Sequence, residues 1–263
     1  MSGPDGGGAE DPVSGGAPLP RVHQLKARYV RRVTPDHLGE RVSIRHLYDD
    51  PDRGPVPTDV VGRLVGADAG AMLVVDRAGQ LTVVDPARVL ASRVVPPHPR
   101  LPPEPPVGTE DAPLYRAAAR VLLLDAADRI LLVAHAPDPH RRVWTAPGGG
   151  LRPGEDHRDG ARRELEEEIG ITLEPGPWVW SRRVTFVFRG CWLDQEERWF
   201  LTRTDTADAG AAPLDDPGAV TARWWPLPEL HDTDAEVAPR ALADHLATLL
   251  RDGAPDTPVD VGR

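Results

Sequence analysis

Three glutamates in the middle of the chain have the spacing that most directly suggests chemistry. Glu164, Glu167 and Glu168 stand at positions i, i+3 and i+4, so in a helix all three project from one face. A hard divalent cation such as Mg²⁺ or Mn²⁺ prefers oxygen ligands and would relieve their mutual repulsion. A solvated acidic helix would show the same spacing, so the residues alone leave a surface helix and a metal site both open.

A glycine-rich loop precedes this acidic segment. Residues 148–150 are all glycine, and the loop runs on to Glu155. Because glycine has no side chain, such a loop lets backbone carbonyls and amides approach a metal ion or a phosphate. Gly170 follows the acidic segment, where a residue in the left-handed conformation would end a helix. A glycine loop followed by an acidic helix is consistent with metal-assisted phosphate chemistry, and a solvated acidic helix remains the equal alternative.

Residues 149–171 resemble the Nudix box, G-x5-E-x7-R-E-U-x-E-E-x-G-U with U aliphatic, at every defined position. Residues 144–148 also resemble the usual lead-in to the box in that family. The residues at the defined positions are Gly149, Glu155, Arg163, Glu164, Leu165, Glu167, Glu168, Gly170 and Ile171. A match of this length is far more specific than a lone glycine motif. It implies a pyrophosphohydrolase that acts on phosphorus-containing anhydrides.

The resemblance also implies a metal centre with Mg²⁺ or Mn²⁺ as cofactor. Glu167 and Glu168 correspond to the principal metal-binding carboxylates. Glu164 corresponds to a residue that binds the metal directly or through water and can deprotonate the nucleophile. The carbonyl of Gly148 or Gly149 would complete the metal shell. A bound metal lowers the pKa of its water and neutralises the charge that develops on the phosphates.

The other defined positions of the box are expected to support this metal centre. Arg163 is expected to be catalytic together with the three glutamates. It would hold a glutamate by charge-assisted hydrogen bonds. Glu155 would tie the loop to the helix by a salt bridge, and Gly170 would close the helix. Several family members use a further acidic residue outside the box as ligand or base. By sequence order the candidates are Asp215, Asp216, Glu196 and Glu197. The sequence does not assign the substrate-binding residues.

Residues 114–252 are expected to form an α+β domain. Two apolar runs, 120–124 and 129–133, predict a buried β-hairpin. Further strands are predicted near 184–188, 197–202 and 222–226, and helices at 158–169 and 239–251. The lack of regular alternation favours an α/β/α sandwich with a mixed sheet, which the Nudix resemblance also implies. Trp225 is expected to pack in the core, with stacking on a nucleotide base as the alternative.

The N-terminal part is predicted to hold a separate small β module. Residues 1–20 are rich in glycine and proline and are expected to be a disordered tail. Within residues 21–97, short apolar segments at 41–45, 60–65, 72–75 and 81–84 predict strands, with a hairpin turn at Ala78-Gly79. Through the segments 39–42, 58–64 and 94–97, residues 35–97 resemble the SH3-like module that precedes the catalytic domain in some bacterial acetyltransferases. Residues 98–113 predict a proline-rich linker, and residues 253–263 a C-terminal tail.

Composition limits the classes of partner. A net charge of -10 argues against a general polyanion binder, so nucleic acid is not an expected partner. The N-terminal module has several arginines that leave a nucleic-acid role open, Arg28, Arg31, Arg32, Arg41 and Arg45. A solvated surface is the favoured interpretation, because the same span holds Asp49, Asp50 and Asp52. The single cysteine, Cys191, excludes an internal disulfide and is expected to be buried. With no signal-peptide pattern and no long apolar run, a cytoplasmic protein without a membrane partner is expected.

The sequence therefore predicts a metal-dependent Nudix hydrolase. Its substrate is expected to be a small-molecule nucleotide, a nucleoside diphosphate linked to another moiety, of the NTP, ADP-ribose or sugar-nucleotide type. The alternative is a nucleotide-binding regulator that retains the fold without turnover, which loss of the box glutamates would have favoured. The oligomeric state is left open, with a homodimer as one candidate, and so is the purpose of the N-terminal module.

Overall fold

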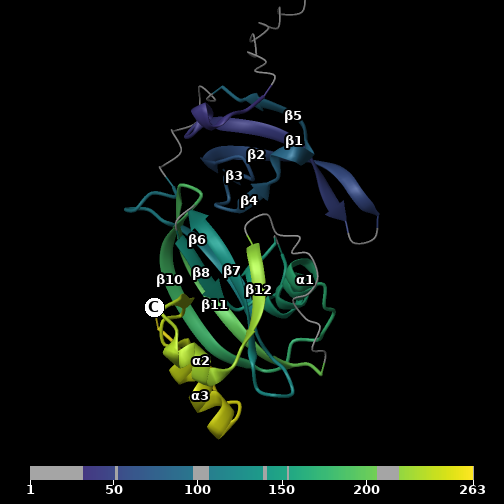
Figure 1. The fold of residues 1–263 in the computed structure, drawn as a ribbon. Coiled ribbons are helices and arrows are strands. Elements are labelled where there is room, and N and C mark those ends of the chain that lie inside the picture. Colours follow the sequence, from purple (N-terminus) through teal and green to yellow (C-terminus); the bar gives the residue numbers. More distant parts are fainter. Residues whose placement is uncertain are drawn as a thin grey trace, which may run out of the picture.

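The computed structural model describes residues 32–50, 53–96, 107–138, 141–152, 154–205 and 219–262. The predicted tail of residues 1–20, and residues 98–106 of the predicted linker, lie outside these ranges. In Figure 1 a small sheet formed by β1 to β5 sits over one end of a larger sheet that carries the helices. No helix in the described ranges is both long and apolar enough to cross a membrane.

The N-terminal module is an antiparallel sheet of five strands in the order β4-β3-β2-β1-β5. The strands are β1 (Arg41–Asp50), β2 (Gly54–Ala67), β3 (Met72–Val75), β4 (Leu81–Val84) and β5 (Val89–Val94), with 3₁₀ turns η1 (Pro35–His37) and η2 (Pro86–Arg88). Val42 and Ile44 are fully buried, as their alternation with polar neighbours predicted. Gly79, at φ 83°, turns the chain between β3 and β4, so the predicted hairpin is confirmed. The SH3-like topology stays a prediction.

The larger sheet is mixed. Its order is β13-β8-β7-β6-β11-β10-β14, with β12 paired to β7 and β9 paired to β6. The strands are β6 (Leu114–Leu124), β7 (Ile130–Asp138), β8 (Arg141–Thr145), β9 (Gly148–Gly150), β10 (Trp178–Phe188), β11 (Cys191–Arg203), β12 (Ala219–Trp225), β13 (Glu236–Ala238) and β14 (Val259–Asp260). The pairing of β6 with β11 is parallel, whereas β10 and β11 form a long antiparallel pair.

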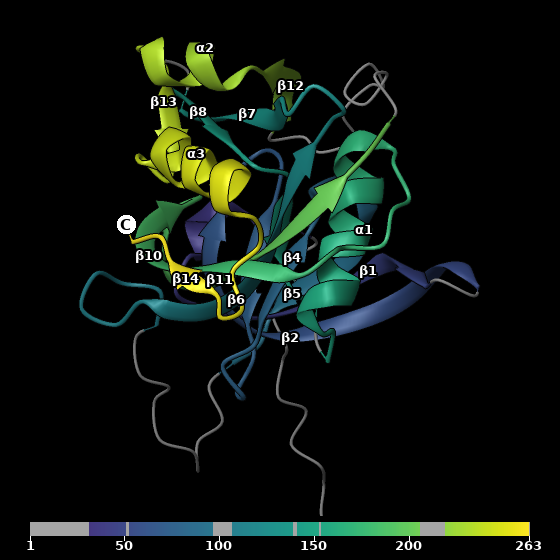
Figure 2. The ribbon, with the colours of Figure 1, turned by 90° about the horizontal axis from the view of Figure 1, so that it is seen from below.

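Helices cover both faces of this sheet, as Figure 2 shows. They are α1 (His157–Ile169), α2 (Leu227–Asp232) and α3 (Leu242–Asp252). Side chains alternate along β6, so Val121 and Leu123 pack with Leu165 of α1, whereas Leu122 packs with Leu246 of α3. All are fully buried. The predicted mixed-sheet α/β/α sandwich is confirmed.

The ends of α1 follow from local sequence. The side chain of Asp156 accepts hydrogen bonds from the backbone N–H groups of Arg158 and Asp159, at 2.8 and 2.9 Å, and so caps the first turn. Gly170, at φ 67°, ends the helix in the left-handed conformation, as predicted. These two signals fix the register of the glutamates between them.

Two segments differ from their predicted form. The expected hairpin pairs only at its turn, Leu124 with Ile130, because β6 continues along β11 and β7 continues along β12 and β8. Each of the two strands therefore pairs over most of its length with other strands and not with its hairpin partner. The segment expected as a C-terminal tail adds β14 beside β10, and its Val261 is buried in the core. Trp225 is 3% exposed and packs edge-on against Trp144, which confirms the core interpretation.

Candidate active site

The face of α1 that turns toward the glycine loop carries the three glutamates. Glu168 is 4% exposed and its Oε2 accepts a hydrogen bond from the backbone N–H of Gly148, at 2.8 Å. A Cβ added to Gly149 would stand 2.7 Å from Oε1 of Glu164, so only glycine allows the carboxylate to come this close to the loop. Glu167 is the most exposed of the three. The structure therefore brings all three predicted carboxylates to one side of β9.

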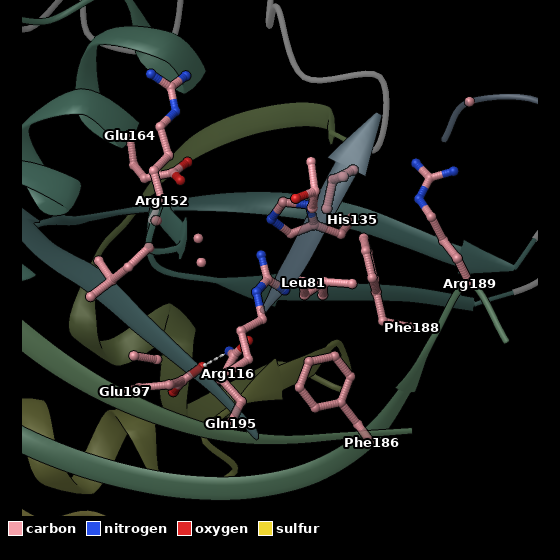
Figure 3. Close-up of a pocket in the computed structure, with 18 of the residues that line it drawn as sticks. Leu81, Arg116, His135, Arg152, Glu164, Phe186, Phe188, Arg189, Gln195 and Glu197 are labelled. Atoms are coloured by element: carbon pink, nitrogen blue, oxygen red, sulfur yellow. Dashed lines mark hydrogen bonds between the residues drawn. The ribbon is translucent and has the colours of Figure 1, made fainter. Parts of the chain in front are cut away.

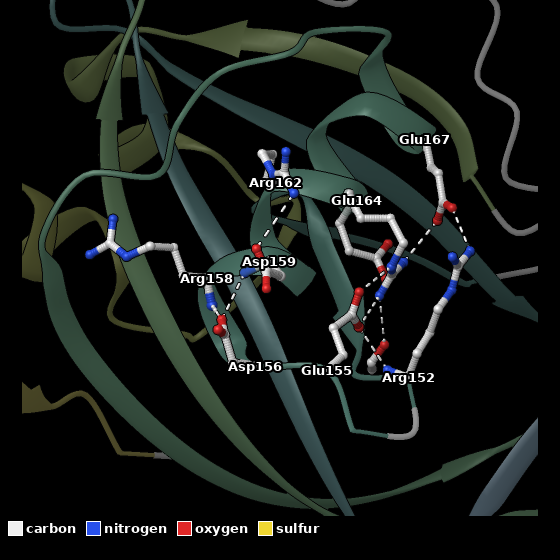
Figure 4. A network of polar contacts seen from close by, with 10 residues as sticks. Arg152, Glu155, Asp156, Arg158, Asp159, Arg162, Glu164 and Glu167 are labelled. Carbon is white, nitrogen blue, oxygen red and sulfur yellow. Dashed lines mark hydrogen bonds and ion pairs between the residues drawn. The ribbon is translucent and has the colours of Figure 1, made fainter. Parts of the chain in front are cut away.

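Arg163 links the loop to the helix through its partners Glu155, Glu164 and Glu167, which are labelled in Figure 4. Its Nε and one terminal nitrogen donate to the two oxygens of Glu155, at 2.7 and 2.8 Å. The other terminal nitrogen donates to Glu164 and to Glu167, at 2.7 and 2.8 Å. A further contact of 3.2 Å reaches the carbonyl of Gly150. This guanidinium therefore fixes the spacing between the helix carboxylates and the loop.

Burial and Arg163 act in opposite directions on the two half-buried carboxylates. For Glu155, burial raises the pKa, but hydrogen bonds from Arg163 and from the backbone N–H of Arg152 outweigh it, and the pKa lies below its ordinary value. For Glu164, burial dominates over the attraction of Arg163, and the pKa is raised. Glu155 is thus held as a structural anion, whereas Glu164 is the carboxylate that more readily accepts a proton.

The donor chemistry of this face fits a hard divalent cation. Carboxylates of Glu164, Glu167 and Glu168, with the carbonyl of Gly148, are the oxygen ligands that Mg²⁺ and Mn²⁺ prefer. In the described part of the chain, no group of three or more acidic, histidine or cysteine side chains is already placed to hold a metal together. Glu164 and Glu167 are instead directed onto Arg163, so binding a cation would require these two side chains to turn from the guanidinium.

The parallel register of β6 and β11 builds the floor of the same pocket. It sets Arg116 beside Gln195 and Arg120 beside Trp199. One terminal nitrogen of Arg120 donates to the carbonyl of Gly148, at 2.8 Å, so this arginine holds the glycine loop from below. Neighbouring strands thus direct charged side chains into a pocket that α1 borders.

A buried carboxylate lies in that floor. Glu197 is 1% exposed and accepts hydrogen bonds from Gln195, at 2.8 Å, and from the ring N–H of Trp199, at 3.0 Å. Arg120 and Arg182 each approach it at 3.4 Å. Burial opposes ionisation, but the charges of these two arginines hold the pKa of Glu197 below its ordinary value.

Glu197 differs from the other candidates for an extra acid. Glu196, its neighbour, points to the other side of β11 and accepts a hydrogen bond from the exposed Tyr115, at 3.2 Å. Asp215 and Asp216 lie outside the described residues. Of the two candidates that the structure describes, Glu197 is the one that lines the pocket.

Arg116 lines the pocket and was not singled out from the sequence. Its half-buried side chain points into the pocket, between Glu197 and Glu164 in Figure 3. Among the described residues, no carboxylate lies within ion-pair distance of its guanidinium, which stands 5.6 Å from the ring centre of Phe188. Burial lowers the pKa of Arg116 to about 10. The signal in the sequence was the spacing of Arg116 and Arg120, two charges on one face of an apolar strand.

Comparison with known proteins supports the resemblance. The family model described as NUDIX domain matches residues 114–246. An RNA pyrophosphohydrolase of Roseobacter denitrificans is 30% identical over 128 residues, which covers 44% of this chain and 79% of the relative. One of Rhodopseudomonas palustris strain ATCC BAA-98 / CGA009 is 31% identical over 144 residues, 46% of this chain and 84% of the relative. The crystal structure of a MutT protein from Methanosarcina mazei Go1 aligns with a TM-score of 0.43 and 22% identity, over 54% of this chain and 97% of that one.

The matched residues begin at the first strand of the mixed sheet and end within α3, so they contain the whole glycine loop, α1 and the pocket floor. The N-terminal module lies outside the match. The expectation of a Nudix-type pyrophosphohydrolase is thereby confirmed at the level of the family. The match spans just over half of the sequence, and the chain belongs to the Nudix family.

Proposed function

We propose that this chain hydrolyses a phosphoanhydride bond in a nucleoside diphosphate linked to another moiety, with Mg²⁺ or Mn²⁺ as cofactor. The observation that supports it most directly is the opposition of charges across the pocket. Acidic side chains on α1 line one part of the pocket, and the guanidinium of Arg116, which no described carboxylate approaches within ion-pair distance, lies near them. A pocket that offers metal ligands and a guanidinium together suits a phosphate chain, which needs both for charge neutralisation.

The residues divide the work by position. Glu164, Glu167 and Glu168, with the carbonyl of Gly148, would hold the metal, which supplies charge neutralisation and an acidified water. Glu164, on the helix face that borders the glycine loop, would be placed to take a proton from the attacking water. Arg163 would position the carboxylates without touching substrate.

Arg116 would bind a phosphate oxygen. Burial lowers its pKa, and the attraction of Glu164, which does not reach ion-pair distance, only partly offsets that effect. A phosphate in the pocket would supply a partner at that distance through charge-assisted hydrogen bonds. The names of the relatives, RNA pyrophosphohydrolases, add a 5′-triphosphate end to the chemistries that deserve testing.

The test is product release from nucleoside triphosphates, ADP-ribose, sugar nucleotides and a 5′-triphosphate oligonucleotide, with Mg²⁺ or Mn²⁺. Glu168→Gln should lower metal-dependent turnover at least about 100-fold, the scale of losing one group that stabilises transition-state charge. Glu166→Gln is the matched control, because Glu166 is exposed on the same helix and outside the defined box positions. Equal activity of both variants would contradict the assignment. Tight nucleotide binding without product in the wild type would favour the regulator.

A further inference from the structure

We propose that the N-terminal module is the second wall of the substrate pocket and that Leu81 and Val83 of β4, facing Phe186 and Phe188 of β10, receive the base of the nucleotide. This inference rests on the proposed function. It assigns the base-binding subsite and gives the module a role in specificity.

The module is packed firmly against the Nudix domain. Leu73 and Val75 of β3 form one buried cluster with Leu114, Cys191 and Leu193 of the mixed sheet. A buried apolar cluster with members from both bodies holds them in one relative position. The lone thiol lies inside it, and burial raises the pKa of Cys191 to about 11.

Close backbone contacts reinforce this packing. A Cβ added to Gly66 of β2 would stand 2.6 Å from the carbonyl oxygen of Arg189, and one added to Gly108 would stand 2.5 Å from the Sγ of Cys191. The side chain of Arg189 also forms an ion pair with Asp68 of the module. Gly108 belongs to residues 107–113, the end of the predicted linker, which here packs at the boundary between the two bodies.

The alternation of side chains along β4 directs Leu81 and Val83 toward the pocket. In the antiparallel pair of β3 and β4, Leu81 lies opposite Val75 and Val83 lies opposite Leu73, so these four share one face. Because Leu73 and Val75 face the Nudix domain, Leu81 and Val83 do too. Leu81 is half-buried against the shared cluster, whereas Val83 is 47% exposed and lines the open pocket.

The pocket changes character along its length, and the order is that of a nucleotide. Glu164 of α1 lies at one end and Arg116 lies next. The apolar side chains of Leu81, Phe186 and Phe188 follow, with Arg189 beyond Phe188 (Figure 3). The guanidinium groups of Arg116 and Arg189 lie 5.6 and 5.4 Å from the ring centre of Phe188, so the apolar part is bordered by positive charge. If the metal at the α1 carboxylates and the guanidinium of Arg116 bind the phosphates, the apolar side chains receive the next part of the nucleotide. A planar base gains more than a sugar does from aromatic and apolar contacts, so we assign the base to this part of the pocket.

Equilibrium binding tests the inference apart from turnover. Dissociation constants for ATP and for inorganic tripolyphosphate, which has no base, are measured by calorimetry on the full chain. Val83→Ala and Leu81→Ala should each weaken ATP binding roughly fivefold, the scale of losing one or two buried methyl contacts. Tripolyphosphate binding should stay unchanged. Leu90→Ala is the matched control, because Leu90 is a 54% exposed aliphatic residue of β5 outside the pocket lining.

The single cysteine reports whether a variant has undocked the module. Cys191 is fully buried, so its reaction with a thiol reagent should stay as slow in Val83→Ala as in the wild type. The inference is overturned if both β4 variants keep the wild-type ratio of ATP to tripolyphosphate affinity, or if Leu90→Ala lowers it equally. Hydrolysis of ATP with an unchanged ratio would overturn the base subsite alone. If the chain neither binds nor hydrolyses any nucleotide tested, the proposed function is contradicted as well.

Discussion

The contact between Arg163 and Glu155 yields a quantitative prediction about the architecture of the Nudix box. The two side chains are only 15% and 13% exposed and share two hydrogen bonds of 2.7 and 2.8 Å. Each charge-assisted hydrogen bond contributes about 1.5 kcal/mol. Removing one partner also leaves the other charge buried without compensation, which is destabilising. We therefore expect Arg163→Ala to lower the free energy of unfolding by about 3 kcal/mol. A double-mutant cycle with Glu155→Ala should give a coupling of about 2 kcal/mol.

An exposed pair of the same geometry provides the control. Arg45 and Asp59 of the N-terminal module also share two hydrogen bonds, at 2.9 and 2.7 Å, but their side chains are 57% and 47% exposed. Water screens such a pair, so its coupling should be much smaller than that of the buried pair. Urea denaturation at pH 7 in EDTA measures both cycles under identical conditions. A coupling at Arg163 as small as that at Arg45 would refute the view that burial makes the box pair strong.

The pH dependence gives a second check on the same pair. The folded-state pKa of Glu155 is depressed, so its contribution is complete above the ordinary carboxyl pKa of about 4.3. It is lost as the pH falls through the lower, folded-state value. The coupling between Arg163 and Glu155 should therefore persist to pH 4.5 and shrink at more acid pH. A coupling that is independent of pH down to acid unfolding would contradict the ionic interpretation.

Three further outcomes follow from burial and backbone geometry. Leu246→Ala, at a fully buried position of α3, should lower the free energy of unfolding by about 3 kcal/mol in urea denaturation. Gly148→Ala should lower the melting temperature sharply, because φ is 140° and a Cβ would stand 2.1 Å from the carbonyl oxygen of Ala119. Asp125→Asn should cost about 1 kcal/mol at pH 7, since Asp125 accepts from the backbone N–H and the Nε of Arg129, at 2.8 and 2.6 Å. Burial raises the pKa of Asp125, but the hydrogen bonds outweigh it and the pKa lies below its ordinary value. The stability difference between Asp125→Asn and the wild type should therefore vanish as the pH falls through this lowered pKa.

The helix of the box could be predicted almost residue by residue because its signals are local. Asp156 caps its first turn and Gly170 ends it, so the register of the carboxylates depends on nothing outside the segment. The strands of the module were likewise visible in short alternating segments, and Val42 and Ile44 face the core as expected. Elements whose geometry is set within one or two turns of chain are the ones that a single sequence specifies.

The pocket floor depends on pairings that local patterns do not contain. The parallel register of β6 and β11 joins residues about 80 positions apart and sets Arg116 next to Gln195. The same register decides that Glu197 faces the pocket while Glu196 faces outward, a choice that the two adjacent glutamates leave open in the sequence. A shift of one residue would exchange them. An acidic candidate therefore becomes distinguishable only after the strand order is known.

The position of the module is harder still to foresee, because its docking uses residues that look ordinary in sequence. Leu73 and Val75 are typical strand residues, and Cys191 was expected only to be buried, not to lie between two bodies. Their arrangement matters because the matched Nudix region alone would leave Phe186 and Phe188 without the facing wall that Leu81 supplies. If β4 sets what the pocket accepts, then a chain with the same box and a different first domain should bind a different base. The specificity of this protein would then reside in a part of the sequence that its family match does not cover.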